Sequence, residues 1–375
     1  MKRCIFYLPY KLPEHCVTPG QLRPKKMVQA FRDIGYDVFV IWGYCEERKE
    51  LIKELKSNIK NGYQYEFMYT ESSSIPTLLT EPHHYPTHPF MDFSFFRYIK
   101  RQGIKIGLFY RDIHWKFNIF KPSTYPKPLA PLESYIYLTL YKYDIIQYKR
   151  LVDRFYLPSM TMAELIGSKR LKSIAALLIP GSDNLSVKHK DYSQRDFTKK
   201  PLNIFYVGNV SEHYHLTEMV KAVSRTKHCT MTLCCNKWIW DRVKEKFEPY
   251  LNENIRIIHK SSDELEPYYE EADIGSIFFE HNDYMDMAIP FKSFEYLANE
   301  IPAIATTNTA IGNFIEKNNI GWTLPYNADA ACELLNRIIK NPELISEKQY
   351  NCVKTKQENL WTVRAKKVEQ DLCSL

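Results

Sequence analysis

The chain has 375 residues, which suits two domains of roughly 150–190 residues better than one. A hydrophobic share of 45%, including 14% aromatic residues, supports large cores and excludes a disordered protein. Charge is unevenly divided: residues 1–178 carry 27 Lys and Arg against 16 Asp and Glu, a balance of +11, and the remainder carries 24 against 28, a balance of −4. The basic half predicts an anionic partner, a phosphate-bearing lipid or an acidic membrane surface. An ordinary solvated face is the alternative.

The start of the chain, "MKRCIFYLPYK", has two basic residues and an apolar run that ends at Lys11. No small-residue cleavage site follows, so we interpret it as the first strand and not as a signal peptide. No apolar run approaches the ~20 residues that span a bilayer.

The nine cysteines form no C-x-x-C pair, which indicates reduced thiols. Cys234 and Cys235 lie in an apolar strand pattern and are expected to be buried. The sequence therefore predicts a cytoplasmic protein, with peripheral attachment to the inner face of the cell membrane as a further expectation and no nucleic-acid partner.

Strands and helices alternate along the first half of the chain. Buried strands are predicted at 4–9, 37–43 and 104–110, and helices at 21–34 and 46–60. In the first helix Met27, Ala30, Phe31 and Ile34 recur at helical spacing, and Gly35 follows where a helix ends. This alternation is typical of α/β layers with mainly parallel sheets.

The second half repeats the alternation. Strands are predicted at 202–210, 229–235, 255–260, 274–280 and 302–307, with helices at 215–225, 240–251 and 265–272 and another near 290–298. The polar, turn-rich segment 179–200 is the expected linker. Two Rossmann-like, doubly wound domains in tandem give a central cleft, and ligands in such sheets bind beyond the carboxyl ends of the strands.

The segment "AIPFKSFEYLANEIPAIATTN", residues 288–308, is the most informative one. Pro290 suits the first position of a helix, and the three-residue spacing of Lys292 and Glu295 puts both on one face. The helix start with Lys292 suits a pyrophosphate, and the Glu295 carboxylate suits vicinal ribose hydroxyls. The alternative is a surface ion pair of little energetic value. The residues alone leave the two interpretations close to even.

The same segment resembles the donor-binding segment of family 4 retaining glycosyltransferases of the GT-B fold, in the subgroup with Pro-x-Lys-x-x-Glu-Tyr-Leu-Ala. The resemblance extends to "IFYVGNV", "YYEEADIGSIFF", "NNIGWTLP" and the closing "ENLWTVRAKKVEQDL". It covers the second half, and the first half more loosely through "HCVTPGQLRPKKMVQAFRDIGYDV" and "GLFYRDIHWKF". It implies an acceptor-side domain at 1–179, a nucleotide-sugar domain at 180–356, and a C-terminal helix at 357–375 that packs back onto the first domain.

The resemblance also implies donor contacts. Glu295 would hold the ribose hydroxyls, and Lys292 the diphosphate, because the family's usual Arg and Lys after "YVG" are absent. The other nucleotide-binding candidates are Asn209, Ser211, Asn236, His259, Lys260 and Phe291. Met287 stands where the family has a Glu on the donor sugar, so the sugar candidates are Asp283, Asp286, Met287 and Ala288. The donor would be a nucleotide-diphosphate sugar as co-substrate, without cofactor or metal.

Arg111, Asp112 and His114 follow the strand 104–110 and are the catalytic candidates. A carboxylate or His there could receive the acceptor's proton or stabilise developing positive charge. The alternative is that Asp112 caps a turn or pairs with Arg111.

The segment 81–96 holds His83, His84 and His88 close to Glu81, but its prolines disfavour the helix that would align them on a metal. An acceptor-facing loop is the preferred interpretation, with aromatic contacts from Tyr85, Phe90, Phe95 and Phe96.

Together these features predict a retaining, metal-independent glycosyltransferase (a hexosyltransferase) that acts on a saccharide acceptor. That acceptor is expected to be lipid-linked, as in bacterial capsule or O-antigen biosynthesis, with a soluble saccharide as the other option. A sugar-nucleotide epimerase of similar fold and a catalytically inactive protein that binds a glycan or a partner are the alternatives.

Overall fold

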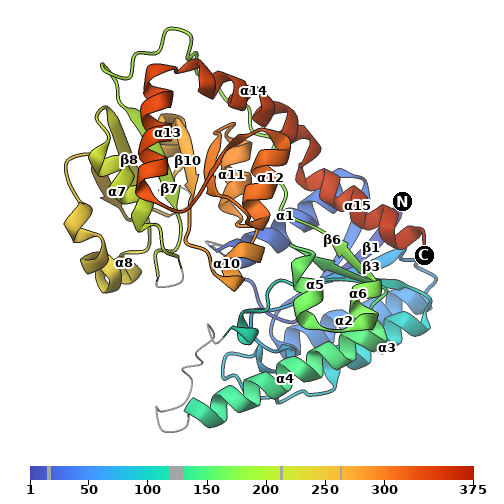
Figure 1. Cartoon of the computed structure of the whole chain (residues 1–375). Coiled ribbons are helices and arrows are strands. Elements are labelled where there is room, and N and C mark those ends of the chain that lie inside the picture. Colours follow the sequence, from blue (N-terminus) through green and yellow to red (C-terminus); the bar gives the residue numbers. More distant parts are fainter. Residues whose placement is uncertain (15–17, 118–129, 212–213, 262–263) are drawn as a thin grey trace. The chain divides into compact units, whose positions relative to one another are not determined.

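The computed structural model describes residues 1–14, 18–117, 130–211, 214–261 and 264–375. Cys16, one of the expected reduced thiols, lies outside these ranges. The chain forms two compact units (Figure 1). The first unit comprises Met1–Pro180 and Trp361–Leu375, and the second comprises Gly181–Leu360.

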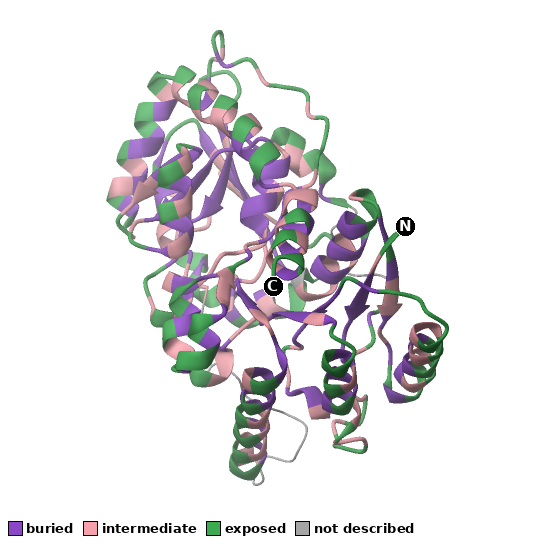
Figure 2. Cartoon of the chain, turned by 90° about the vertical axis from the view of Figure 1, so that its right-hand side faces the viewer, coloured by how far each residue is buried: buried purple, intermediate pink, exposed green. Residues whose placement is uncertain are grey.

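The first unit is built on a parallel sheet of six strands in the order β2-β1-β3-β4-β5-β6. Its strands are β1 (Lys2–Tyr7), β2 (Tyr36–Ile41), β3 (Phe67–Glu71), β4 (Lys105–Phe109), β5 (Arg154–Leu157) and β6 (Ala175–Leu177). All five residues of β3 are buried, as a parallel strand covered on both faces requires. Figure 2 shows buried residues along the strands of both units. Its helices are α1 (Pro19–Asp33), α2 (Cys45–Lys60), α3 (Met91–Arg101), α4 (Ala130–Leu151), α5 (Thr161–Ile166), α6 (Lys169–Ser173) and α15 (Trp361–Cys373). The C-terminal helix α15 packs on α1.

The second unit has another six-stranded parallel sheet, in the order β12-β11-β10-β7-β8-β9. Its strands are β7 (Leu202–Val207), β8 (Cys229–Cys234), β9 (Ile255–Ile258), β10 (Ile274–Ile277), β11 (Ala303–Thr306) and β12 (Gly321–Leu324). Its helices are α7 (Thr217–Arg225), α8 (Lys237–Val243), α9 (Glu266–Glu271), α10 (Asp283–Met287), α11 (Lys292–Ala298), α12 (Ala310–Asn318), α13 (Ala328–Lys340) and α14 (Glu343–Glu358). The prediction of two doubly wound α/β sheets is confirmed.

One predicted helix is wrong. Residues 240–251 do not form a single helix, because α8 ends at Val243 and two short 3₁₀ turns follow, Lys244–Lys246 and Glu248–Tyr250. Pro249 lacks the backbone N–H that a longer helix would need and disfavours helical geometry at Glu248. The start also lies earlier than predicted, because the Asn236 side chain caps the helix by accepting a hydrogen bond from the Trp238 N–H.

Each sheet has one point where the strand order changes direction, between β1 and β3 in the first unit and between β7 and β10 in the second. The loops beyond the carboxyl ends of these strands diverge there and leave space for a ligand. Among the described helices, none combines the length and the apolar character that crossing a bilayer demands.

Candidate functional site

Gly208 lies directly after β7, at the switch point of the second sheet. Its φ of +136° is a conformation that residues with a side chain rarely adopt, so glycine is required there. A Cβ at this position would also come within 2.7 Å of the Lys292 Nζ. The glycine therefore lets the first residue of α11 place its ammonium against the backbone that follows β7.

Lys292 is buried, and few contacts stabilise its charge. Its side chain lies over the Tyr206 ring, with Nζ 3.8 Å from the ring centroid, and 5.1 Å from that of Phe279. Within the part of the chain that the structure describes, Nζ has no hydrogen-bond partner. Burial lowers the pKa of Lys292 to about 7, against a smaller opposing effect of the Glu295 charge. A buried, unpartnered ammonium is costly, and an anionic ligand would remove that cost.

Glu295 stands one turn further along α11 and is half-buried. Its Oε2 accepts a hydrogen bond of 3.3 Å from the Tyr269 hydroxyl of α9. Burial, followed by the nearby Glu295 charge, raises the pKa of Tyr269, so the hydroxyl keeps its proton and remains a donor. This contact orients the carboxylate without neutralising it.

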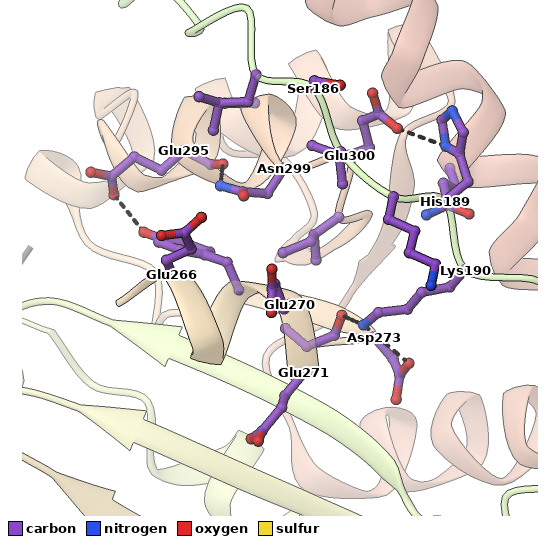
Figure 3. Close-up of a pocket in the computed structure, with 18 of the residues that line it drawn as sticks. Ser186, His189, Lys190, Glu266, Glu270, Glu271, Asp273, Glu295, Asn299 and Glu300 are labelled. Carbon is purple, nitrogen blue, oxygen red and sulfur yellow. Dashed lines mark hydrogen bonds and ion pairs between the residues drawn. The ribbon is translucent and has the colours of Figure 1, made fainter. Parts of the chain in front are cut away.

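A cavity of about 950 Å³ lies beside Glu295 within the second unit, between α9, α11 and the segment 183–200 (Figure 3). Ion pairs of that segment line it: His189 meets Glu300 at 2.8 Å, and Lys190 meets Asp273 at 3.6 Å. The lining includes eight Asp and Glu residues against four Lys and Arg. This acidic balance disfavours a diphosphate inside the cavity, so the buried Lys292 is the better phosphate position.

The other nucleotide-binding candidates make local contacts near the carboxyl ends of the strands. The Asn209 side chain accepts from the Ser211 N–H at 2.8 Å. Asn236 caps α8, His259 contacts the Cys235 carbonyl oxygen at 2.8 Å, and Lys260 pairs with Glu264 at 2.6 Å. Phe291 immediately precedes α11. Asn236, His259 and Lys260 follow strands β8 and β9 and are exposed.

The sugar candidates lie on α10, in the loop after β10. Asp283 is exposed, and the Asp286 carboxylate contacts the His281 ring nitrogen at 2.9 Å. Met287 is 3% exposed, so its side chain packs inside the unit, and Ala288 at the helix end is half-buried. Of the four, Asp283 and Asp286 present polar atoms to the surface.

In the first unit, Arg111, Asp112 and His114 follow β4. Arg111 donates to the Tyr10 hydroxyl at 2.8 Å and pairs with Glu71 at 3.3 Å. Asp112 instead accepts from the His114 N–H at 2.9 Å, and its other oxygen lies 3.5 Å from the His114 ring Nδ1. Asp112 therefore caps the turn after β4, which agrees with the capping alternative, and lies beside the His114 ring, whereas the ion pair of Arg111 is with Glu71.

The aromatic interpretation of 81–96 needs correction. Phe95 and Phe96 belong to α3 and are 2% and 3% exposed, so they pack in the core and cannot meet an acceptor. Tyr85 and Phe90 are exposed.

The three histidines of that segment do not converge. His83 stacks on Tyr85, and His84 contacts the Leu79 carbonyl oxygen. His88 approaches Cys45 and Glu46 closely enough for a shared metal ion. The Lys49 ammonium already lies between two of these groups, 2.7 Å from Glu46 and 2.9 Å from His88.

Sequence reasoning missed three residues that shape these sites. Glu71 is completely buried at the end of β3 and pairs with both Arg23 and Arg111. Gly208 and Tyr269 support Lys292 and Glu295. The glycine directly after an apolar strand was a usable signal, whereas Glu71 and Tyr269 carried none, because their partners are distant in sequence.

No protein-family model and no curated protein matches this sequence. The fold does match solved structures over the full chain. Alr3699/HepE of Anabaena, in complex with UDP-glucose, aligns with a TM-score of 0.63 at 11% identity, covering 100% of both chains. Sucrose-phosphate synthase of Thermosynechococcus elongatus aligns at 0.61 and 13%, covering 98% of this chain and 97% of the other. A glycosyltransferase of Rickettsia africae aligns at 0.58 and 15%, covering 99% and 98%. The fold is therefore that of the GT-B glycosyltransferase structures.

Proposed function

We propose that this protein is a retaining glycosyltransferase that moves a sugar from a nucleotide-diphosphate sugar to a saccharide acceptor. The observation that carries the proposal is the buried, unpartnered ammonium of Lys292 at the switch point of the second sheet. The similar fold of Alr3699/HepE, whose structure holds UDP-glucose, supports a nucleotide-sugar donor.

Lys292 would act on the leaving group. Transfer of the sugar breaks its bond to the terminal phosphate of the donor and leaves a second negative charge on that phosphate, and a preorganised cation in a water-poor site stabilises this developing charge. Because Lys292 supplies this charge, no divalent ion is needed in the proposed reaction. Glu295, oriented by Tyr269, would accept hydrogen bonds from the two ribose hydroxyls.

The pair of Asp112 and His114 is proposed to serve the acceptor side. The Nδ1 of His114 lies 3.5 Å from Asp112, and its Nε2 lies 3.3 Å from the Tyr141 hydroxyl. Such a pair can take up the proton that the acceptor hydroxyl releases. A transfer that retains the anomeric configuration without a covalent enzyme intermediate needs no enzyme nucleophile in addition to this pair.

The acceptor is proposed to be lipid-linked and handled at the cytoplasmic face of a bacterial membrane, in surface polysaccharide biosynthesis. The +11 balance of residues 1–178 supports an anionic surface on that side. Met287 stands where the glycosyltransferases that the sequence resembles have a Glu that contacts the donor sugar. Asp283 and Asp286 would contact the hydroxyls of the donor sugar instead.

A binding series tests the donor site. Lys292→Ala should weaken a nucleoside diphosphate by about 1.5–3 kcal/mol, the scale of hydrogen bonds to charged groups, and leave the nucleoside unchanged. Equal affinity of the variant and the parent for every ligand would contradict the proposal.

Turnover is tested separately: nucleoside diphosphate should be released from a nucleotide sugar only when an acceptor is present. Interconversion of nucleotide sugars without an acceptor would favour an epimerase. Nucleotide binding without turnover across a panel of acceptors would favour a catalytically inactive protein.

A further inference from the structure

The helix α4 of the first unit exposes an apolar stripe that the fold does not use. Leu132, Tyr135, Leu138 and Ile146 are 56%, 69%, 38% and 44% exposed. They recur every three or four residues together with the exposed Lys142 and Arg150, so the six side chains share one face of the helix. At 1.5 Å per residue the stripe is about 27 Å long. We call these six residues the α4 stripe.

The opposite face of α4 already supplies the core contacts. Tyr137 and Tyr141 pack with Leu79, and Tyr148 packs against Phe93. The helix is therefore apolar toward the core and apolar again toward the outside, where Figure 1 shows it as a long helix along the first unit. A surface helix of a stable monomer has no packing reason to present this second apolar face.

The charges on α4 are sorted between the same two faces. Its two acidic residues, Glu133 and Asp144, are 0% and 4% exposed. Its exposed charges are the cations Lys142 and Arg150, and the half-buried Lys149 adds a third. Within the described ranges, none of these three cations pairs with a carboxylate. The neighbouring helix α6, which packs against α4, exposes Lys169 and Arg170 as well.

We propose that the α4 stripe docks the first unit on an anionic lipid bilayer. Leucine, isoleucine and tyrosine side chains would enter the boundary between headgroups and acyl chains, while Lys142 and Arg150 extend to the lipid phosphates. Both kinds of residue stand on one helix face, which is the arrangement of an interfacial helix lying in the membrane plane.

A second copy of the chain fits this face less well. A two-fold contact would set the stripe against itself, bringing the cations Lys142 and Arg150 of both copies together with no exposed carboxylate on the helix to compensate. Charge complementarity therefore favours the bilayer. The proposal places the membrane contact of the proposed function on one helix, and it does not depend on the transfer reaction.

Vesicle sedimentation without nucleotide tests the proposal. The parent should bind vesicles of phosphatidylcholine mixed with phosphatidylglycerol, bind phosphatidylcholine alone weakly, and lose affinity as salt is raised. Leu132→Gln with Leu138→Gln and Ile146→Gln should lower partitioning about tenfold or more. Lys142→Gln with Arg150→Gln should weaken the preference for the anionic lipid, with Lys149, Lys169 and Arg170 still present. The matched control is Tyr350→Ser, which removes a 75% exposed tyrosine from α14 of the second unit and should change nothing.

The outcomes are separable from those of the donor site. A melting-temperature shift with nucleoside diphosphate should be the same for the parent and the stripe variants, which shows that they remain folded and bind nucleotide. Stripe variants that bind anionic vesicles like the parent would overturn the proposal, as would a parent that binds neither vesicle. A parent that is dimeric in light scattering, with the triple Gln variant monomeric, would assign the stripe to self-association and also overturn it.

Discussion

The ammonium of Lys292 and the backbone of Gly208 approach each other so closely that a Cβ on the glycine would lie 2.7 Å from Nζ. The two residues come from α11 and from the end of β7, and they meet because β7 and β10 are neighbours at the switch point of the sheet. The fold thus keeps a cation in a place where its own contacts do not satisfy it. Several measurable properties depend on this arrangement.

Removal of the Lys292 charge should stabilise the protein. The pKa of Lys292 is about 7 in the folded chain and 10.5 for an ordinary lysine, so folding disfavours the charged form. The resulting penalty is complete below pH 7 and fades between pH 7 and 10.5, because there the unfolded chain binds more protons than the folded one. At about 1.4 kcal/mol per unit, the upper bound of the penalty is about 5 kcal/mol. Lys292→Met should therefore be more stable at pH 6.5 in denaturant titrations, and the gain should shrink at pH 9.5.

Lys356 provides the control for this experiment. It is also buried, but its Nζ pairs with Glu300 at 2.5 Å and contacts the Leu185 carbonyl oxygen at 2.9 Å. Lys356→Met should destabilise the protein by roughly 3–5 kcal/mol, because the buried Glu300 carboxylate loses its lysine partner and is left with the His189 ring, which is charged only when it is protonated. Two buried lysines should thus respond with opposite signs. A loss of stability in both variants would contradict the account of Lys292.

Binding of a nucleoside diphosphate should take up a proton above pH 7. The free protein holds Lys292 partly neutral there, and the bound phosphate favours the ammonium. Affinity should therefore fall as the pH rises from 7 to 9, approaching about tenfold per unit where the proton must be supplied by the solvent. Calorimetry at pH 8 in two buffers of different ionisation enthalpy measures the uptake. A nucleoside without phosphate should show none, and the same lack of uptake is expected for Lys292→Met with the diphosphate. Equal heats in both buffers for the parent would exclude this linkage.

Glu295 should act on the nucleoside part of the ligand alone. Glu295→Gln should weaken nucleoside, monophosphate and diphosphate alike, by about 1.5–3 kcal/mol, because a charged acceptor of two ribose hydroxyls is lost. Tyr269→Phe should have a smaller effect of the same kind, about 0.5–1.5 kcal/mol, because it removes only the hydrogen bond that orients the carboxylate. Calorimetry with the three ligands gives the comparison. A loss confined to the diphosphate would show that Glu295 does not face the ribose.

The sequence predicted the strands that are continuous apolar runs, such as β1, β4 and β7, because burial on both faces leaves a visible pattern. It missed β3, whose five residues precede a polar stretch and resemble an ordinary loop. It also missed α4, since a helix that is apolar on two faces has no clear helical period. The second half was predicted more completely because short strands and amphipathic helices alternate there without long interruptions.

The candidate site shows the same limit at the level of single residues. Lys292 and Glu295 stood out because their spacing on one helix is a local property. The glycine after β7 was visible in the sequence, but its approach to Lys292 and the contact of Tyr269 with Glu295 depend on the order of strands in the sheet, which the sequence does not reveal. Phe95 and Phe96 were misjudged for the reverse reason: an aromatic run next to prolines resembles a surface loop until α3 turns it toward the core.

Asp112 should matter for turnover and not for nucleotide binding. It belongs to the first unit and pairs with the His114 ring, so Asp112→Asn keeps the acceptor of the His114 N–H hydrogen bond while it removes the charge. If the pair takes up the acceptor's proton, kcat should fall by about 10²–10⁴-fold, the range of general base catalysis. Nucleotide affinity and the melting temperature should stay at the parental values.

A suitable control is Asp37→Asn, which removes an exposed carboxylate that pairs with Arg3 in the same unit. The kcat of this variant should not change, because a surface ion pair contributes little. Measuring kcat with saturating donor and acceptor, beside the calorimetric affinity for nucleoside diphosphate, separates the two effects. Parental turnover in Asp112→Asn would remove Asp112 from the reaction and leave it a structural role in the turn after β4.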